Sequence, residues 1–334
     1  MKAIINTKLV MEDGIIWDGV LTFEDDKIVQ VGWAKDVYIP ADAEIIDAGG
    51  LYTAPGLVDI HCHGNGDNWF HDDPVGCAAY FIKHGVTTVL PTFYHGNSQQ
   101  EMIEGAARIR EAAKTGVGRV IDGVYMEGPF MSKEKKGVHK EENLRLPDLS
   151  LVEKMQKYAK GKIKIVTVAP ELEGALDFIE KGKEKYRISI AHTSANYEVS
   201  TKAFAAGATQ LTHFFNGMVP FNHREPGIIG AAWENNDCMA ELICDEFHIH
   251  PLVINMTFRI FGPERVILVS DSMRATGMED GNYTLGEHKV IVRDSVARME
   301  DGTLAGSTRN LMDCLKIAVQ EIHIPFSYDH FFIF

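Results

Sequence analysis

Eight short apolar runs separated by helical patterns occupy most of the chain. The runs are LVDI, VTTVLPT, VIDGVYM, IKIVTVA, ISIAH, TQLTH, MAELICD and VILVSD. Stretches with helical periodicity, such as SQQEMIEGAARIREAAKTG and SLVEKMQKYAKG, lie between them. Apolar strands that alternate with helices are typical of a parallel sheet, and eight such strands can close into a (β/α)8 barrel.

Turn-rich β sequence flanks this pattern at both ends. The N-terminal region, KAIINTKLVMEDGIIWDGVLTFEDDKIVQVG, has β-branched and aromatic stretches separated by Asp-Gly and Glu-Asp-Asp, which is typical of short antiparallel strands. The segment NYTLGEHKVIVRDSVARMEDGTLAG repeats this pattern after the eighth run. We therefore predict an α/β fold, in which a (β/α)8 TIM-type barrel is accompanied by a small β-sandwich domain built from both flanking segments. The predicted boundaries are 1–54 for the N-terminal part of the small domain, 55–277 for the barrel, 278–304 for the C-terminal part of the small domain, and 305–334 for a barrel helix and a truncated tail.

Composition narrows the classes of partner. The chain has 334 residues, of which 45% are hydrophobic, so it can bury a large core. A formal net charge of −14 leaves no broad positive field, which argues against a nucleic-acid or anionic-membrane surface. The five cysteines form no CxxC pair, and no segment has the length of a membrane span or the pattern of a signal peptide. We expect buried thiols in a cytoplasmic protein whose ligands are small molecules, with no nucleic acid and no membrane as partner.

Two histidines at the end of the first apolar run provide the strongest chemical signal. Successive side chains of a strand point to opposite faces, so His61 and His63 face the same side and could bind one metal ion together. The alternative is that both histidines hydrogen-bond to the backbone at a strand end. Later runs carry, at or near their ends, further side chains that can bind metal or transfer protons: Glu127, His192, His213, His248 and Asp271. Because the active site of such a barrel lies at the C-terminal ends of its strands, these side chains are expected to converge.

Several ordered motifs between about residues 48 and 312 resemble the amidohydrolase superfamily. They are APGLVDIHCHG, GVTTVLPT, EGPF followed by KKGVH, IAHTSA, LTHFFNGM with HREPG, CDEFHIHP, VSDSMRATG and LAGS. The HxH pair occurs in many amidohydrolases, whereas the combination of EGPF, THxFNxM and REPG is similar to the narrower family of N-acetylglucosamine-6-phosphate deacetylases. The resemblance implies hydrolysis of the acetamide of N-acetylglucosamine 6-phosphate to glucosamine 6-phosphate and acetate, in amino-sugar catabolism.

The resemblance also implies a metal site. Its main ligands would be Glu127, His192 and His213, while His61 and His63 would complete that site or hold a second metal. The cofactor would be one or two divalent ions of zinc, iron, manganese or cobalt, since imidazole and carboxylate ligands accept all of these. Such an ion suits the reaction, because an amide resists neutral water and a bound metal lowers the pKa of water toward neutrality. The alternatives are a backbone-capping role for Glu127 and, for His192 and His213, core histidines with satisfied hydrogen bonds.

Two residues match the catalytic positions of the family. Asp271 would act as general base and then general acid, taking a proton from the attacking water and passing it to the departing amine. His248 would polarise the acetyl carbonyl and stabilise the oxyanion. Asp271 could instead cap a helix that begins near Ser272.

The substrate contacts of the family are matched as well. Arg224 and His139 correspond to its phosphate contacts, and the family's arginine reaches across a dimer interface, which implies a homodimer. The alternative for Arg224 is a surface salt bridge. The sugar hydroxyls and acetyl group would be contacted by Val138, Asn216, Gly217, His248, Leu304, Ala305 and Gly306. Gly217 stands where the family more often has alanine.

Two other functions stay open on the sequence alone. One is an amidohydrolase that acts on another N-acetylated amino-sugar phosphate or another N-acyl amide. The other is an inactive barrel that binds a sugar phosphate, because the chain ends at FFIF where the family continues through further helices and Gly-rich strands. Exposed Phe331, Phe332 and Phe334 would then favour association.

Overall fold

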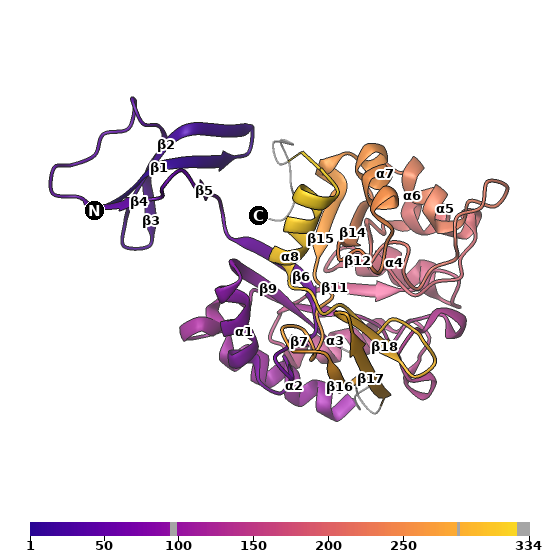
Figure 1. Cartoon of the computed structure of the whole chain (residues 1–334). Helices are drawn as coiled ribbons and strands as arrows, with labels where there is room; N and C mark the ends of the chain where they lie inside the picture. Colours follow the sequence, from indigo (N-terminus) through magenta and orange to yellow (C-terminus); the bar gives the residue numbers. More distant parts are fainter. Residues whose placement is uncertain (94–98, 286–287, 326–334) are drawn as a thin grey trace. The chain divides into compact units, whose positions relative to one another are not determined.

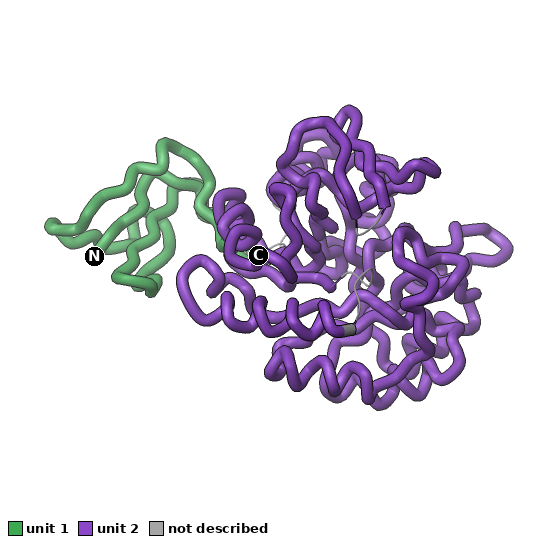
Figure 2. The backbone as a smooth tube through the Cα atoms, turned by 90° about the horizontal axis from the view of Figure 1, so that it is seen from below, with its two compact units in different colours: residues 1–56, 325–332, 334 green, residues 57–324, 333 purple. Residues whose placement is uncertain are grey.

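The structure, a computed structural model, describes residues 1–93, 99–285 and 288–325. The described residues form two compact units, one within residues 1–56 and the other within residues 57–324, which Figure 2 draws in different colours. The aromatic tail that the sequence predicts to be truncated lies outside the described residues. Each unit is built around a sheet of its own, so the two are described in turn.

The N-terminal unit is a five-stranded sheet. Its strands are β1 (Lys2–Met11), β2 (Gly14–Glu24), β3 (Lys27–Trp33), β4 (Glu44–Asp47) and β5 (Tyr52–Thr53). Strands β1, β2 and β3 form an antiparallel meander, while β4 and β5 both pair with β1 in parallel. The meander turns at residues 12–13 and 25–26, beside the predicted Asp-Gly and Glu-Asp-Asp signals. This compact unit includes residues 1–56, and the predicted domain limit at residue 54 stays a prediction.

The second unit contains the predicted barrel. Its eight strands are parallel and follow one another around the sheet in chain order: β6 (Leu57–Cys62), β9 (Val86–Phe93), β10 (Val124–Met126), β11 (Ile163–Val168), β12 (Arg187–Ile190), β13 (Gln210–Leu211), β14 (Met239–Ile243) and β15 (Val266–Val269). The first and last strands meet at two points. Asp271 N donates to the His61 carbonyl at 2.9 Å, and the backbones of Cys62 and Ser272 form a parallel β-bridge. The sheet is therefore nearly closed, and the predicted (β/α)8 barrel is confirmed (Figure 1).

Helices alternate with these strands along the chain and lie around the sheet (Figure 1). They are α1 (Pro74–Lys83), α2 (Gln99–Ala112), α3 (Leu149–Tyr158), α4 (Ala175–Gly182), α5 (Tyr197–Ala206), α6 (Gly227–Glu234), α7 (Pro251–Phe261) and α8 (Leu311–Lys316). Shorter elements are the hairpin of β7 (Gly64–Asn65) and β8 (Asn68–Trp69), the 3₁₀-helices η1 (Gly116–Val120), η2 (Lys133–Lys135), η3 (Glu141–Asn143) and η4 (Pro263–Arg265), and the π-helix η5 (Ile317–Glu321).

The starts of several helices follow from local sequence. The side chains of Asp73, Asp148 and Asn196 accept N–H groups in the first turns of α1, α3 and α5, which otherwise lack partners. Helices α2 and α3 correspond to the two stretches whose periodicity predicts them. Among the described residues, no helix is long and apolar enough to cross a membrane. All five cysteines are buried and free, as the sequence predicts.

A three-stranded antiparallel sheet follows the last barrel strand. It consists of β16 (Gly281–Leu285), β17 (His288–Arg293) and β18 (Val296–Met299), where the sequence predicts short strands. Its buried face shares one hydrophobic cluster with the barrel, made of Trp69, Met273, Ala275, Leu285, Val290, Val292, Ala297 and Ala305. The structure thus includes this sheet in the barrel unit. The predicted association of this segment with the N-terminal strands in one small domain stays a prediction.

Val290 tests this packing, because it is completely buried in the shared cluster. Replacing Val290 with Ala is expected to lower the free energy of unfolding by about 2 kcal/mol, since two buried methyl groups are lost and a cavity remains. Urea denaturation followed by circular dichroism measures the change. Arg293→Ala, an exposed change on the same strand, is the control and should alter stability by less than about 0.5 kcal/mol. Equal effects of the two variants would contradict the packing described here.

Candidate active site

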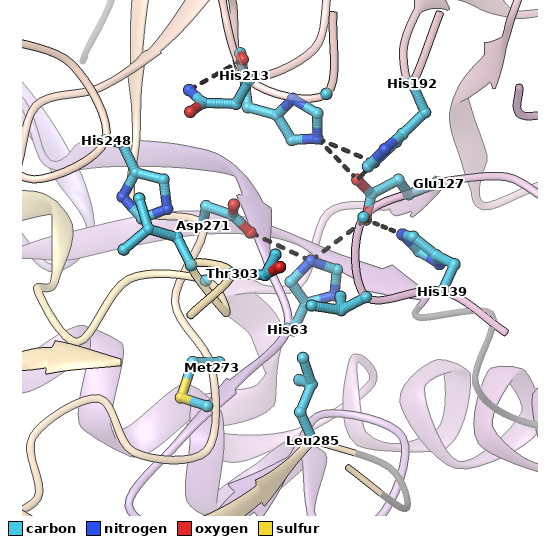
Figure 3. A pocket seen from close by; sticks show the side chains of 16 residues that line it. His63, Glu127, His139, His192, His213, His248, Asp271, Met273, Leu285 and Thr303 are labelled. Carbon is cyan, nitrogen blue, oxygen red and sulfur yellow. Dashed lines mark hydrogen bonds and ion pairs between the residues drawn. The ribbon is translucent and has the colours of Figure 1, made fainter. Parts of the chain in front are cut away.

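One end of the barrel gathers most of the side chains expected to be functional (Figure 3). They line a cavity at the C-terminal ends of the strands and the loops that follow. The expected residues in its lining are His63, Glu127, Val138, His139, His192, His213, Asn216, Gly217, His248, Asp271, Leu304 and Gly306. Leu285 from β16 and Thr303, which follows β18, line the same cavity, beside Met273. The three-stranded sheet is therefore part of the site as well as of the fold.

Three expected residues lie outside this lining. His61 is fully buried, and its Nε2 lies 3.6 Å from carboxylate oxygens of both Glu127 and Asp271. Ala305 is also fully buried and packs in the cluster shared with the three-stranded sheet. Arg224 is exposed on the loop before α6. His61 thus belongs to the polar cluster behind the cavity, whereas the substrate contacts expected of Ala305 and Arg224 stay predictions.

Three of the candidate side chains follow a barrel strand at a residue with a strained backbone. His192, His213 and Asp271 each come two residues after the end of β12, β13 or β15, and their φ angles are 46°, 31° and 46°. Residues other than glycine seldom adopt this left-handed conformation, which costs on the order of 1–3 kcal/mol each. The surrounding backbone holds it: Asp271 N donates to the His61 carbonyl, and the Asp271 carbonyl accepts from Ser307 N, both at 2.9 Å. The turns deliver these side chains to the cavity.

Glu127, directly after β10, is the centre of a carboxylate–imidazole cluster. Its Oε1 lies 3.0 Å from His192 Nε2 and 3.1 Å from His213 Nε2. These two Nε2 atoms are themselves only 3.1 Å apart. The other oxygen, Oε2, lies 3.3 Å from His63 Nε2 and 3.9 Å from His139 Nε2. Imidazoles from several strands and loops therefore point at one buried carboxylate (Figure 3).

Asp271 extends this cluster toward the histidines of β6. Its Oδ1 lies 3.2 Å from His63 Nε2 and 3.6 Å from His61 Nε2. The opposite ring nitrogens are also held, because His63 Nδ1 lies 3.2 Å from the Thr92 carbonyl and His61 Nδ1 lies 2.9 Å from the Glu241 carboxylate. These oxygens can only accept hydrogen bonds, so both Nδ1 atoms donate and both Nε2 atoms face the acids.

Burial and charge pairing shift the pKa values of this cluster in opposite directions. Burial would raise the pKa of Glu127, but the charge on His61 and hydrogen bonds from two further imidazoles hold it well below its ordinary value. Burial also opposes ionisation of Asp271, yet the charges on His61 and His63 lower its pKa to about 2. Against the effect of burial, the same acids raise the pKa of His63 to about 9. Both acids are therefore ionised at neutral pH and need positive charge beside them, either protons on the imidazoles or a metal cation.

His248 is held by a different buried acid. Its Nδ1 donates to Asp245 Oδ2 at 2.7 Å, and Asp245 also accepts the N–H groups of Phe247 and His248 and the hydroxyl of Ser307. Burial opposes both charges, but the pairing lowers the pKa of Asp245 and raises the pKa of His248. The ring is thereby fixed at the cavity, and charged His248 can donate a hydrogen bond from Nε2.

Gly217 occupies a position that disfavours a side chain. Its φ is +62°, and a Cβ there would lie 2.9 Å from Nδ1 of His192. The Gly217 carbonyl accepts from Thr193 N at 2.9 Å, so the loop after β13 is joined to the turn after β12. The neighbouring Asn216 donates from Nδ2 to the carbonyl of His213 at 3.3 Å. This pair therefore supports the imidazoles as well as lining the cavity.

The cluster fits a divalent cation. Two groups of three residues could each hold a cation. Within each group the three ligand atoms lie within 4.8 Å of one another; one group is His61, His63 and Asp271, and the other is Glu127, His139 and His192. His61 Nε2 is buried and has no hydrogen-bond partner among the described residues. Such an atom, next to ionised carboxylates, suits coordination, because imidazole and carboxylate are common ligands of zinc, iron, manganese and cobalt.

Further buried acids support the site and are not identified in the sequence analysis. Glu241 within β14 contacts His61, and Asp245 after the same strand contacts His248. Asp59 in β6 accepts two backbone N–H groups, and burial raises its pKa to about 6. A usable signal was present, since a lone acid in an apolar strand such as LVDI or MAELICD is costly to bury without partners.

Known proteins are similar to this chain over most of its length. A sequence model described as the amidohydrolase family matches residues 52–319. An N-acetylglucosamine-6-phosphate deacetylase of Bacillus subtilis is 36% identical over 316 residues, covering 90% of this chain and 77% of the relative. An N-acetylgalactosamine-6-phosphate deacetylase of Escherichia coli O157:H7 is 31% identical over 308 residues, covering 90% and 79%. The structure of a mutant N-acetyl-D-glucosamine-6-phosphate deacetylase from Mycobacterium smegmatis, in complex with N-acetyl-D-glucosamine-6-phosphate, has a TM-score of 0.87 at 30% identity, covering 97% of this chain and 84% of that one.

The cation site can be tested by thermal stability. Adding zinc to chelator-treated protein should raise its Tm, because a ligand that binds only the folded state stabilises it by about 3 kcal/mol at a hundredfold excess over Kd. His213→Gln keeps a similar volume but removes a nitrogen beside Glu127, and it should reduce the zinc-dependent rise by more than half. His84→Gln is the control, because it changes a histidine outside the cluster whose Nδ1 hydrogen-bonds to the backbone carbonyl of Tyr80 in α1. An equal rise in both variants would argue against a cation at His213.

Proposed function

The chain belongs to the amidohydrolase family, and on this premise we propose that it hydrolyses the acetamide of N-acetylglucosamine 6-phosphate to glucosamine 6-phosphate and acetate. One observation carries the proposal. In a chain that matches a deacetylase over 90% of its length, a single cavity brings together an ionised acid, a carboxylate–imidazole cluster and a histidine whose pKa a buried acid raises. These are the groups that amide hydrolysis requires.

A divalent cation is part of the proposal. Glu127, His192 and His213 would hold it, and His61 and His63 would complete this site or hold a second ion. When bound, such an ion supplies Lewis acidity, which lowers the pKa of water toward neutrality and polarises a carbonyl. Zinc, iron, manganese and cobalt all suit these ligands, and metal analysis of the purified protein identifies the native one.

Asp271 is proposed to move the proton. It is ionised in the free chain and lines the cavity, so it can accept a proton from the water that attacks the acetyl carbon. An amide nitrogen leaves poorly as an anion, and Asp271 would therefore return the proton to it as the carbon–nitrogen bond breaks. One water is consumed, and acetate and the free amine are released. In the free chain Asp271 Oδ1 lies 3.2 Å from His63 Nε2, so the carboxylate is placed directly beside the proposed cation ligands.

His248 is proposed to stabilise the developing oxyanion. The Asp245 carboxylate raises the pKa of His248 and so favours the protonated ring, which would donate a hydrogen bond from Nε2 to the carbonyl oxygen. The hydroxyl of Ser307 also bonds to Asp245, which restrains the pair from the loop that contains Leu304 and Gly306. Substrate binding in that loop and charge stabilisation at His248 would therefore be coupled.

Recognition of the sugar phosphate is proposed to involve two chains. His139, Val138 and Gly306 line the cavity, but the expected phosphate ligand Arg224 is exposed and does not line the cavity of its own chain. This position is compatible with a homodimer in which Arg224 serves the neighbouring site. An arginine suits the task because its guanidinium can donate two hydrogen bonds to one phosphate.

A second candidate substrate has specific support. One relative, which matches 90% of this chain, is an N-acetylgalactosamine-6-phosphate deacetylase. N-Acetylgalactosamine 6-phosphate, an epimer of the first substrate, is therefore the second candidate. The two substrates carry the same acetamide and the same phosphate, and they would use the same catalytic groups.

The substrate is tested by measuring amine release from N-acetylglucosamine 6-phosphate with metal-loaded protein. We expect turnover of the phosphorylated sugar and a kcat/KM at least about 100-fold lower for unphosphorylated N-acetylglucosamine, since a charged contact contributes a few kcal/mol. N-Acetylgalactosamine 6-phosphate is assayed in parallel and decides between the epimers. A folded, metal-containing sample that releases amine from neither phosphorylated sugar would contradict the proposal and indicate an inactive binding barrel.

Asp271→Asn tests the proton-transfer role. The amide keeps the shape of the carboxylate but cannot accept the proton, so kcat should fall by about 10²- to 10⁴-fold while KM changes little. Steady-state assays give both values, and metal content is determined on the same sample. Loss of the metal together with activity would instead indicate that Asp271 is required as a ligand.

A further inference from the structure

Glu241 is a completely buried carboxylate that no step of the proposed reaction uses. Its Oε1 lies 3.0 Å from the Tyr125 hydroxyl and 2.5 Å from Gln210 Nε2. Its Oε2 lies 2.9 Å from His61 Nδ1 and 3.2 Å from the backbone N of His213. An ionised carboxylate accepts about four hydrogen bonds, so all of its acceptor sites are occupied by donors.

This arrangement determines which nitrogen of His61 faces the cluster. Because the Glu241 carboxylate can only accept, the Nδ1 of His61 must donate, and Nε2 is the nitrogen left for a ligand. That Nε2 is fully buried, lies 3.6 Å from the acids Glu127 and Asp271, and has no hydrogen-bond partner among the described residues. Because this nitrogen lies between two carboxylates and its ring is held from Nδ1, a cation bound there would take the place of a proton on Nε2.

We propose that Glu241 is a positioning residue of the cation site: it fixes the ring of His61 and the backbone of His213 so that both histidines present Nε2 to the same ion. Carboxylates that hold a metal-bound histidine by its other nitrogen raise cation affinity by orienting the ring. The inference rests on the proposed function, because it takes His61 and His213 as cation ligands.

A second layer of side chains holds Glu241 itself. The Tyr125 hydroxyl also lies 2.6 Å from Thr212 Oγ1, which lies 2.7 Å from Ser189 Oγ. All three of these residues are buried and come from β10, the β13 end and β12. Hydrogen-bonded side chains from three other strands thereby restrain the carboxylate, as orientation of a ligand requires.

An amide could not replace this carboxylate. Glu241→Gln keeps the size of the side chain, but its NH₂ group would face either the pair His61 Nδ1 and His213 N or the pair Tyr125 and Gln210, all of which donate in the native network. One donor pair would then lose its acceptor. We expect Glu241→Gln to weaken cobalt binding to the metal-free protein by about 10- to 100-fold.

Cobalt affinity is measured by competition with a chromophoric chelator, which does not depend on catalysis. The series comprises the native chain, Glu241→Gln, His61→Gln and the double variant. If Glu241 acts through His61, Glu241→Gln should cost much less affinity in the His61→Gln background than in the native chain. Equal losses in both backgrounds would overturn the inference, because a general structural defect would explain them.

Asp245→Asn is the matched control. It also removes one buried carboxylate near the cavity, but that carboxylate holds His248 rather than a cation ligand, so cobalt affinity should change by less than about threefold. A loss as large as that of Glu241→Gln would assign the effect to charge alone and overturn the inference. Circular dichroism checks that each variant folds. If Glu241→Gln does not fold, Glu241→Asp replaces it in the same measurements, because aspartate keeps the charge but is too short to reach His61 in the same way.

The outcomes separate the inference from the proposed function. Native protein that binds no cobalt would overturn both. Cobalt binding that depends on His61 but not on Glu241 would overturn the inference alone and leave the deacetylase proposal standing.

Discussion

The buried carboxylate of Glu127 is the group on which the rest of the site depends. An ionised acid inside a barrel is costly unless positive charge lies beside it, and here the Nε2 atoms of His192 and His213 lie within 3.1 Å of it. In the free chain a proton on His61 can supply that charge, and a divalent cation would supply it in its place. Because a cation binds the unprotonated nitrogen, its entry must expel that proton, so cation affinity and proton release are linked.

The strained turns after β12, β13 and β15 connect this cluster to the fold. A regular strand end would leave the side chains at 192, 213 and 271 where the strand's alternation puts them, whereas the left-handed backbone at these residues departs from that alternation. Their cost is sustained by backbone hydrogen bonds to other strands, such as that between Asp271 and the His61 carbonyl. The geometry of the site therefore depends on hydrogen bonds between strands that the closed barrel brings together, and not on one loop alone.

How much of this the sequence could predict depends on which interactions are local. The eight apolar runs predict the barrel, and the position of each functional residue at a strand end predicts convergence, because strand periodicity and parallel order are local rules. The packing of β16–β18 on the barrel, the strained φ angles and the contact between Glu241 and His61 are not local, since residues 61 and 241 are joined only by closure of the sheet.

The outer nitrogens of the imidazoles explain why a short motif is insufficient to define this site. His61 is held by a carboxylate of β14, His63 by a carbonyl of β9, and His192 by the carbonyl of Lys135, which lies 2.8 Å from its Nδ1. Each ring therefore takes its orientation from a different part of the barrel, although the first two are neighbours in an HxH pair. The same pair on a strand whose partners lacked these acceptors would be free to rotate or to donate from Nε2. The acceptors behind the histidines set which nitrogen each ring presents to the cavity, and only the closed barrel brings these acceptors together.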